Sequence, residues 1–185
     1  TTLQAGACPA EWEAQPAKRR QKDTQARWTV KHGVRHYGDK NHVNIDNQHK
    51  LIRRYTVTDA AGHDSQVFED VLLARPAGRD VWADAAYRSQ AIEAHLTRRQ
   101  LRSRIQYKGY RHTPVTARQK ASNQKRARTR ARGEHVFGHH VMAMGGKLLR
   151  TIGLVRAWAK LGLRNLTYNF HRFLWLTRSA HPQPA

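Results

Sequence analysis

The segment DVWADAAYRSQAIEAHL, residues 80–96, joins a short apolar run to a stretch with helical spacing. Residues 80–83 have strand character, and the strand pattern ends at Asp84. Apolar residues then recur at helical intervals over 89–101, and a second short strand is predicted over 103–107. A strand, a helix and a second strand in succession indicate a mixed α/β layer fold.

Further elements are predicted on both sides of this segment. Two β-rich stretches with a turn-like linker form a predicted β-hairpin, and a helix capped by Asp64 or Ser65 follows it. After residue 107 a loop precedes a long basic helix, and the clearest helical pattern comes last. These elements are the strands 37–46 and 51–58, the loop 108–116, and the helices 117–143 and 151–178.

The elements divide the chain into three parts. Residues 1–27 are loop-like, residues 28–178 form one predicted domain, and residues 179–185 are a Pro-rich tail. The chain begins with Thr1 instead of Met, which is consistent with a processed or truncated product.

Composition excludes several classes of protein. The chain has 185 residues, with 34 Lys and Arg against 13 Asp and Glu, a net charge of +21. A single cysteine, Cys8, excludes a disulfide-framed secreted domain, and no apolar run is long enough to cross a membrane. A charge this high predicts a polyanionic partner, with nucleic acid as the first candidate.

The charge is also distributed unevenly. Twelve of the 13 acidic residues lie at or before Glu93, whereas 20 of the 34 basic residues lie after it. Glu134 is the one acid in the last 92 residues. A solvated basic surface is the ordinary interpretation of a charge run, but here the asymmetry favours contact with a phosphate backbone.

Two carboxylates are candidates for chemistry. Asp84 ends a strand, where sites form in α/β sheets, although position alone favours the role of a turn or helix-cap aspartate. Glu134 stands alone on an Arg-rich helix, and the alternative role is an ion pair with Arg130 or Arg128. Two carboxylates can bind Mg²⁺ together with substrate phosphates, and two such ions can drive phosphoryl chemistry.

Histidines and aromatic residues give weaker signals. His135, His139 and His140 have helical spacing, but without a His-Glu-x-x-His motif or nearby cysteine a zinc site is disfavoured against phosphate contact or packing. The aromatic residues of 151–178 have the spacing of a buried helix face, which disfavours a base-stacking role.

Several sequence blocks follow one another along the chain: QKDTQARWT (21–29), YGDKNH (37–42), residues 51–59 and 63–65, DAAY (84–87), Arg130-x₃-Glu134 followed by HVFG (135–138), GGK (145–147), and GLRNL (162–166) with Tyr168-Asn169. Together, in this order, they resemble bacterial insertion-sequence transposases of the DDE class, in the group related to insertion sequences four and five. The resemblance covers nearly everything from Trp12 to Leu176.

This resemblance implies an RNase H-like mixed sheet flanked by helices, with Mg²⁺ or Mn²⁺ as cofactor. It gives Asp84 and Glu134 the roles of second and third metal-binding carboxylate in DNA strand cleavage and transfer. The implied partners are DNA, as insertion-sequence terminal repeats and target, and a second copy of the chain, in the bacterial cytoplasm at the nucleoid. The residues expected to contact DNA are Arg88, Lys125, Arg126, Arg128, Arg130, Arg132 and Lys147.

The chain departs from the family pattern at several points, among them Asp39, where family members tend to have Tyr. Ala127 stands where the family has Tyr, and Val141 stands where it has Lys. The Asp-Ala-Thr or Asp-Ala-Ser motif of the first catalytic Asp does not occur in residues 1–27. The expectation is therefore a C-terminal portion that lacks the first strand of the fold and is inactive alone. The alternatives are a non-catalytic DNA-binding fragment and another basic nucleic-acid-binding protein.

Overall fold

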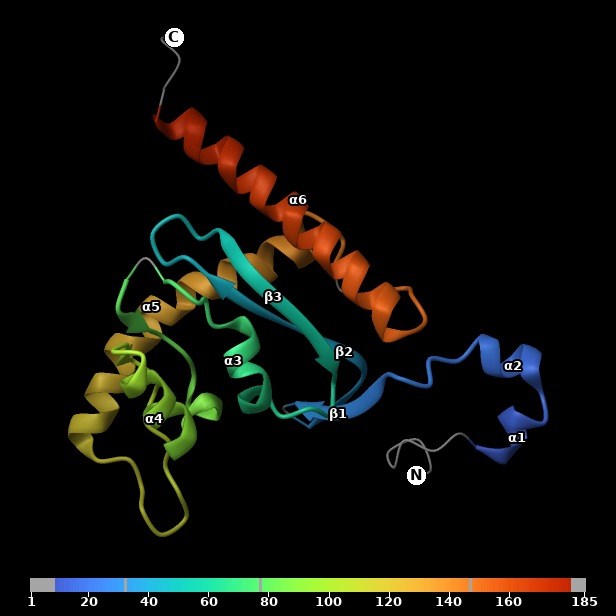
Figure 1. Cartoon of the computed structure of the whole chain (residues 1–185), viewed down its shortest axis with the longest axis horizontal. Coiled ribbons are helices and arrows are strands. Elements are labelled where there is room, and N and C mark those ends of the chain that lie inside the picture. Colours follow the sequence, from blue (N-terminus) through green and yellow to red (C-terminus); the bar gives the residue numbers. More distant parts are fainter. Residues whose placement is uncertain (1–8, 32, 77, 147, 181–185) are drawn as a thin grey trace.

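Two separate sheets carry the fold of this computed structural model, which describes residues 9–31, 33–76, 78–146 and 148–180. Three antiparallel strands form one sheet in the order β1-β2-β3 (Figure 1). In the other sheet β4 pairs with β5 in parallel. The strands are β1 (Arg27–Lys31), β2 (Val34–Ile45), β3 (Ile52–Asp59), β4 (Asp80–Val81) and β5 (Arg102–Ser103). The α-helices are α1 (Ala10–Glu13), α2 (Pro16–Arg20), α3 (Phe68–Val71), α4 (Gln90–Arg98), α5 (Ala117–Met142) and α6 (Leu154–Ala180). The mixed α/β prediction is confirmed.

The predicted hairpin is the pair β2–β3. Asp46 closes its turn, because the carboxylate accepts hydrogen bonds from the backbone of Gln48 and His49 at 2.8 and 3.2 Å. β2 begins at Val34, three residues before the predicted start, and its first five residues pair with β1, which the sequence does not predict. Trp28 and Val30 lie on one face of β1 and are both exposed, so the apolar residues of this strand do not form a buried face.

The segment 80–107 forms the expected strand–helix–strand unit. Ser89 caps α4 by accepting a hydrogen bond from Ile92 N at 3.2 Å. The two strands are shorter than predicted, but backbone hydrogen bonds from Arg104 to Val81 and from Gln106 to Ala83 continue their pairing. One hydrophobic core lies between this unit and α3; its buried members are Phe68, Leu72, Ile92, Leu96 and Ile105.

The helix after β3 begins differently from the prediction. A 3₁₀ turn, η1 (Asp64–Val67), precedes α3, and the capping side chain is His63. His63 Nδ1 accepts from Ser65 N at 3.3 Å, so neither Asp64 nor Ser65 is the cap. An imidazole nitrogen two residues before an amide provides the same acceptor that an Asx side chain provides.

Helices α5 and α6 pack on the larger sheet, and α6 lies along β3 (Figure 1). Thr116 and Gln119 form a capping box at the start of α5. The second core joins these helices to the hairpin through Ile52, Val136 and Tyr168. In α6, Asn169 hydrogen-bonds both the N–H and the C=O of Ile52 at 2.8 Å, as a neighbouring strand would.

The buried face of α6 differs from the predicted one. Ala157, Leu161, Asn165 and Tyr168 face the sheet and are buried. Several residues of the predicted apolar stripe are largely exposed: Trp158, Leu166, Phe170, Phe173 and Leu174. The sequence pattern is apolar over more than half of the helix circumference, so it does not specify which side packs on the sheet.

Gly162 lets α6 approach β3 closely. A Cβ on Gly162 would overlap the ring hydroxyl of Tyr55, so close packing is the reason for this glycine. Within the described residues, no helix combines the length and apolarity that crossing a membrane requires.

Candidate functional site

Asp84 lies directly after β4, at the start of the 3₁₀ turn η2 (Ala85–Tyr87). Its Oδ1 accepts a hydrogen bond from Ala86 N at 2.9 Å, which is the turn-capping role left open by the sequence. No hydrogen bond within the described residues engages Oδ2. The side chain is half-buried, so one carboxylate oxygen remains available for a ligand.

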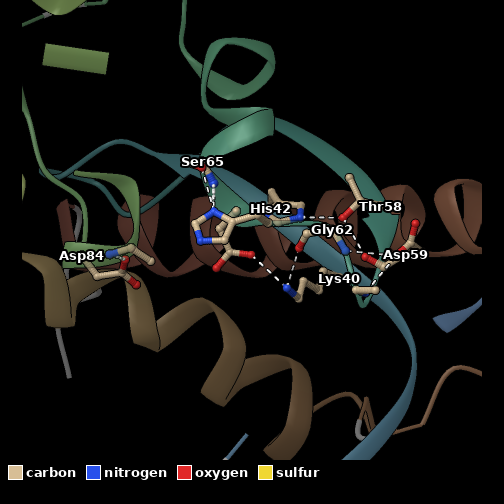
Figure 2. Close-up of polar contacts among 11 residues, drawn as sticks. Lys40, His42, Thr58, Asp59, Gly62, Ser65 and Asp84 are labelled. Carbon is tan, nitrogen blue, oxygen red and sulfur yellow. Dashed lines mark hydrogen bonds and ion pairs between the residues drawn. The ribbon is translucent and has the colours of Figure 1, made fainter. Parts of the chain in front are cut away.

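A polar cluster lies beside the Asp84 turn (Figure 2). Lys40 of β2 donates to Gly62 O at 2.8 Å and pairs with Asp64 at 3.2 Å. The ring of His42 lies 2.9 Å from the Thr58 hydroxyl, and burial lowers the pKa of His42. The cluster thus holds the η1 turn against β2 and β3.

Tyr87 connects this cluster with Asp84. Burial raises the pKa of the Tyr87 hydroxyl, and the carboxylates of Asp64 and Asp84 raise it further. Its ring also packs against Phe68, with the ring centres 5.8 Å apart. Asp84 is therefore fixed at the edge of a hydrophobic core, as a positioned carboxylate requires.

Glu134 lies on α5 with most of its side chain exposed. Its Oε1 accepts a hydrogen bond from Arg130 Nη2 at 2.8 Å, the ion pair considered from the sequence. Asn123, Arg126, Arg130 and Glu134 are spaced by three or four residues and share one face of α5. Asn123 and Arg126 contact Tyr107 just after β5, so this face turns toward the sheet that carries Asp84.

The predicted DNA-contact residues fall into two groups. The guanidinium groups of Arg88 and Arg126 both donate to the backbone carbonyl of Ile105 inside the fold. Arg130 pairs with Glu134, and Arg132 lies 3.3 Å from the carbonyl of Asn47.

Two members of the predicted set, Lys125 and Arg128, are exposed on α5. Because Lys125 and Arg128 are exposed on the same helix, their charges are available to a phosphate backbone. Lys147 lies outside the described residues.

The histidines of α5 pack against α6. His135 lies 3.2 Å from the Tyr168 hydroxyl, and His139 lies 3.1 Å from His171. His140 is buried, and burial together with Arg164 and His139 lowers its pKa to about 4. These contacts fit the packing role that the sequence offered for the three histidines. Across the described ranges, no group of three or more His, Cys, Asp and Glu side chains could hold a metal ion.

Sequence reasoning did not identify Tyr107 or Asn123. A tyrosine at the end of a predicted strand, as Tyr107 is, does not by itself indicate a functional role. An asparagine in a basic helix, as Asn123 is, has the character of an ordinary surface residue. Their roles follow only from contacts between segments 16 residues apart.

Comparison with known proteins identifies the family. The model of the transposase DDE domain matches residues 12–170. The chain belongs to the transposase DDE domain family.

Among curated proteins, this DDE domain chain is similar to the transposase for insertion sequence element IS1106 of Neisseria meningitidis serogroup B, with 29% identity over 148 residues. The match covers 80% of the chain and 51% of the relative, so the chain spans about half the relative's length. No solved structure matches. The resemblance described from the sequence blocks is confirmed at the level of the family.

Proposed function

We propose that this DDE domain chain takes part in DNA transposition and supplies Asp84 and Glu134 to a divalent-metal site for DNA strand cleavage and transfer. The observation that carries the proposal is the family match over residues 12–170, which contains both carboxylates. Two features of the structure support it. Asp84 lies at a strand end, and Arg88 of the same turn donates to the same carbonyl as Arg126 of the helix that carries Glu134.

The arrangement of the strands also supports an RNase H-like scaffold. Its two sheets, β1-β2-β3 and β4-β5, are separate, and a central strand would join them. A strand placed between the two sheets would complete such a scaffold, and Asp84 would then lie at the end of a strand close to the middle of the sheet.

The donor set suits a hard cation. Asp84 and Glu134 each have one carboxylate oxygen in a hydrogen bond within the fold and one available. Mg²⁺ is commonly bound by one or two carboxylates, with waters and substrate phosphates as its other ligands. When bound, Mg²⁺ or Mn²⁺ would activate the attacking oxygen and stabilise the leaving one.

The chain's own side chains would position the DNA. Arg130 holds the carboxylate of Glu134 and can swing to a phosphate when Glu134 turns to a metal ion. The exposed Lys125 and Arg128 on α5 would contact the backbone of the same strand. DNA terminal repeats and target DNA are the partners this predicts, with self-association as a further expectation.

A second function, DNA binding without catalysis, is favoured by one observation. Glu134 is paired with Arg130, and within the described residues no third carboxylate joins it and Asp84. This arrangement fits a chain that occupies insertion-sequence ends and is inactive alone. The two functions predict different behaviour toward metal ions, so one experiment separates them.

The test is Mg²⁺-dependent nicking of duplex DNA that carries the ends of the parent insertion sequence. It compares the 185-residue chain with the product of its complete native reading frame. Glu134→Gln and Asp84→Asn in the latter should abolish cleavage while salt-sensitive DNA binding remains. Glu69→Gln, at an exposed glutamate paired with His95, is the matched control and should cleave normally. Cleavage that survives Glu134→Gln would refute the metal-ligand role.

A further inference from the structure

Two arginines stack on one tyrosine between the candidate carboxylates. The guanidinium carbons of Arg88 and Arg126 each lie 4.4 Å from the ring centre of Tyr107. Arg126 also approaches the Tyr107 hydroxyl, with its Nη2 at 3.4 Å. A guanidinium group within about 6 Å of an aromatic ring centre is attracted by the electrons of the ring face.

Backbone contacts anchor the same three residues. Both arginines donate to the carbonyl of Ile105, a residue with no exposed surface. The side chain of Asn123 holds the backbone of Tyr107 at two points, accepting from its N–H at 2.8 Å and donating to its C=O at 3.0 Å. The ring of Tyr107 is therefore fixed with respect to β5 and to α5.

The stack also places two like charges side by side. Glu93 offsets part of the charge by pairing with Arg88 at 3.3 Å. The ring of Tyr107 and the shared carbonyl of Ile105 provide the remaining attraction within the described residues. The two guanidinium groups repel each other at short range, and the ring supplies attraction that offsets this repulsion, so we expect the arrangement to need an aromatic residue at position 107.

Each arginine belongs to a different half of the candidate site. Arg88 follows Asp84 by four residues and forms the C-terminal cap of the same turn, η2. Arg126 precedes Glu134 by eight residues on α5, on the face that also holds Asn123 and Arg130. The stack thus joins the turn of Asp84 to the helix of Glu134.

We propose that Tyr107 is a positioning residue that sets the separation of Asp84 and Glu134 through Arg88 and Arg126. The inference rests on the proposed function, because only there do the two carboxylates act together. It also assigns Arg88 and Arg126 an internal role instead of contact with DNA. An ordinary packing residue would contribute to stability without controlling this separation, and the two roles can be distinguished.

The first measurement is a distance. In a Cys8→Ser background, cysteines replace the exposed Gln90 on α4 and Ala131 on α5, and electron–electron double resonance measures the separation of two nitroxide labels. Tyr107→Leu should shift and broaden the distance distribution, whereas Tyr107→Phe, which keeps the ring, should leave it unchanged. Leu72→Ala removes a buried side chain of the neighbouring core and serves as a control of reduced stability. It should lower the melting temperature without moving the distance.

The second measurement is DNA cleavage by the product of the complete reading frame. Tyr107→Leu should lower kcat and raise the Mn²⁺ concentration for half-maximal rate, with KM for DNA unchanged, and Tyr107→Phe should restore both. An unchanged distance in Tyr107→Leu would overturn the proposal, as would a shifted distance with normal cleavage. If Asp84→Asn and Glu134→Gln both cleave normally, the proposed function has failed instead, and the positioning role fails with it even if the distance shifts.

Discussion

Two residues with buried, unpartnered polar atoms among the described residues respond to pH in opposite directions. His140 is buried among Arg164, His139 and Tyr168, which makes its protonated form unfavourable, and its Nε2 has no hydrogen-bond partner in the described part of the chain. Asp39 lies directly opposite Asp59 on β2 and β3, and burial raises the pKa of its carboxyl. Raising the pH through the titration range of His140 therefore stabilises the fold, because its neutral form is the one that the folded state favours. Raising the pH through the titration range of Asp39 destabilises the fold, because the folded state favours its protonated form.

Acidification should weaken the fold through His140. The folded-state pKa is about 4 against about 6.5 in the unfolded chain, so the unfolded state binds more protons between these values. Stability is then fully present above pH 6.5 and is lost as pH falls toward 4, by up to roughly 3 kcal/mol. Urea unfolding at a series of pH values measures this. His140→Phe should flatten the dependence, and an unchanged slope would show that His140 does not cause it.

Removing the charge at Asp39 should stabilise the protein at neutral pH. Like charges directly opposite on paired strands are destabilising, and Asp39 Oδ1 is buried without a partner among the described residues. Asp39→Asn should raise the free energy of unfolding by about 0.2–1 kcal/mol at pH 7. The gain should vanish as the carboxyl is protonated at lower pH. Asp70→Asn, at an exposed position on α3, is the control and should show no such gain.

At the scale of elements, α6 depends on a segment more than 120 residues away. Asp23 Oδ2 accepts from Gly153 N at 2.9 Å, and Gln25 Oε1 accepts from Leu154 N at 2.8 Å. These side chains satisfy backbone donors at the start of the helix, which would otherwise lack partners. Part of the QKDTQARWT block is thereby explained by structure, because it caps α6.

Loss of this remote cap should destabilise α6. Gln25→Ala removes the acceptor for Leu154 N and should cost about 0.5–2 kcal/mol, the usual range for an N-terminal cap. Thermal unfolding followed by circular dichroism measures the loss. Gln124→Ala, at an exposed position inside α5, provides the matched control. Equal melting temperatures for the two variants would mean that the cap contributes nothing measurable.

Elements whose signals are local could be predicted from the sequence. The β2–β3 hairpin, α4 and α5 carry their own turn and capping residues, such as Asp46, Ser89 and Thr116. The strand β1 pairs with β2, the next strand in the chain, but its apolar residues are exposed and give no signal of burial. The buried face of α6 and the role of Tyr107 depend on contacts between distant segments, which no short pattern contains. For the same reason Asp84 and Glu134 could be nominated from the sequence, whereas the stack that connects their elements could not.

Across the whole molecule, the basic residues after Glu93 divide into exposed cations and cations bonded inside the fold. Most of the net charge of +21 comes from residues after Glu93. Some of these cations are bonded inside the fold: Arg126 donates to the carbonyl of Ile105 and stacks on the ring of Tyr107. Others remain exposed along the outer side of α5, including Lys125 and Arg128. Helix α5 thus carries an exposed arginine, Arg128, and an internally bonded one, Arg126, whose contributions to DNA binding can be compared directly.

Salt dependence of DNA binding should separate these two kinds of arginine. Each phosphate that the protein no longer neutralises reduces the slope of log K against log salt by about 1. Arg128→Ala should lower affinity and reduce this slope without changing the melting temperature, because Arg128 is exposed. Arg126→Ala should lower the melting temperature and leave the slope unchanged, because its guanidinium group is bound internally. Fluorescence anisotropy of a labelled duplex over a salt series measures both slopes. A reduced slope in Arg126→Ala would show that this guanidinium group reaches DNA, and would contradict its assignment to the stack.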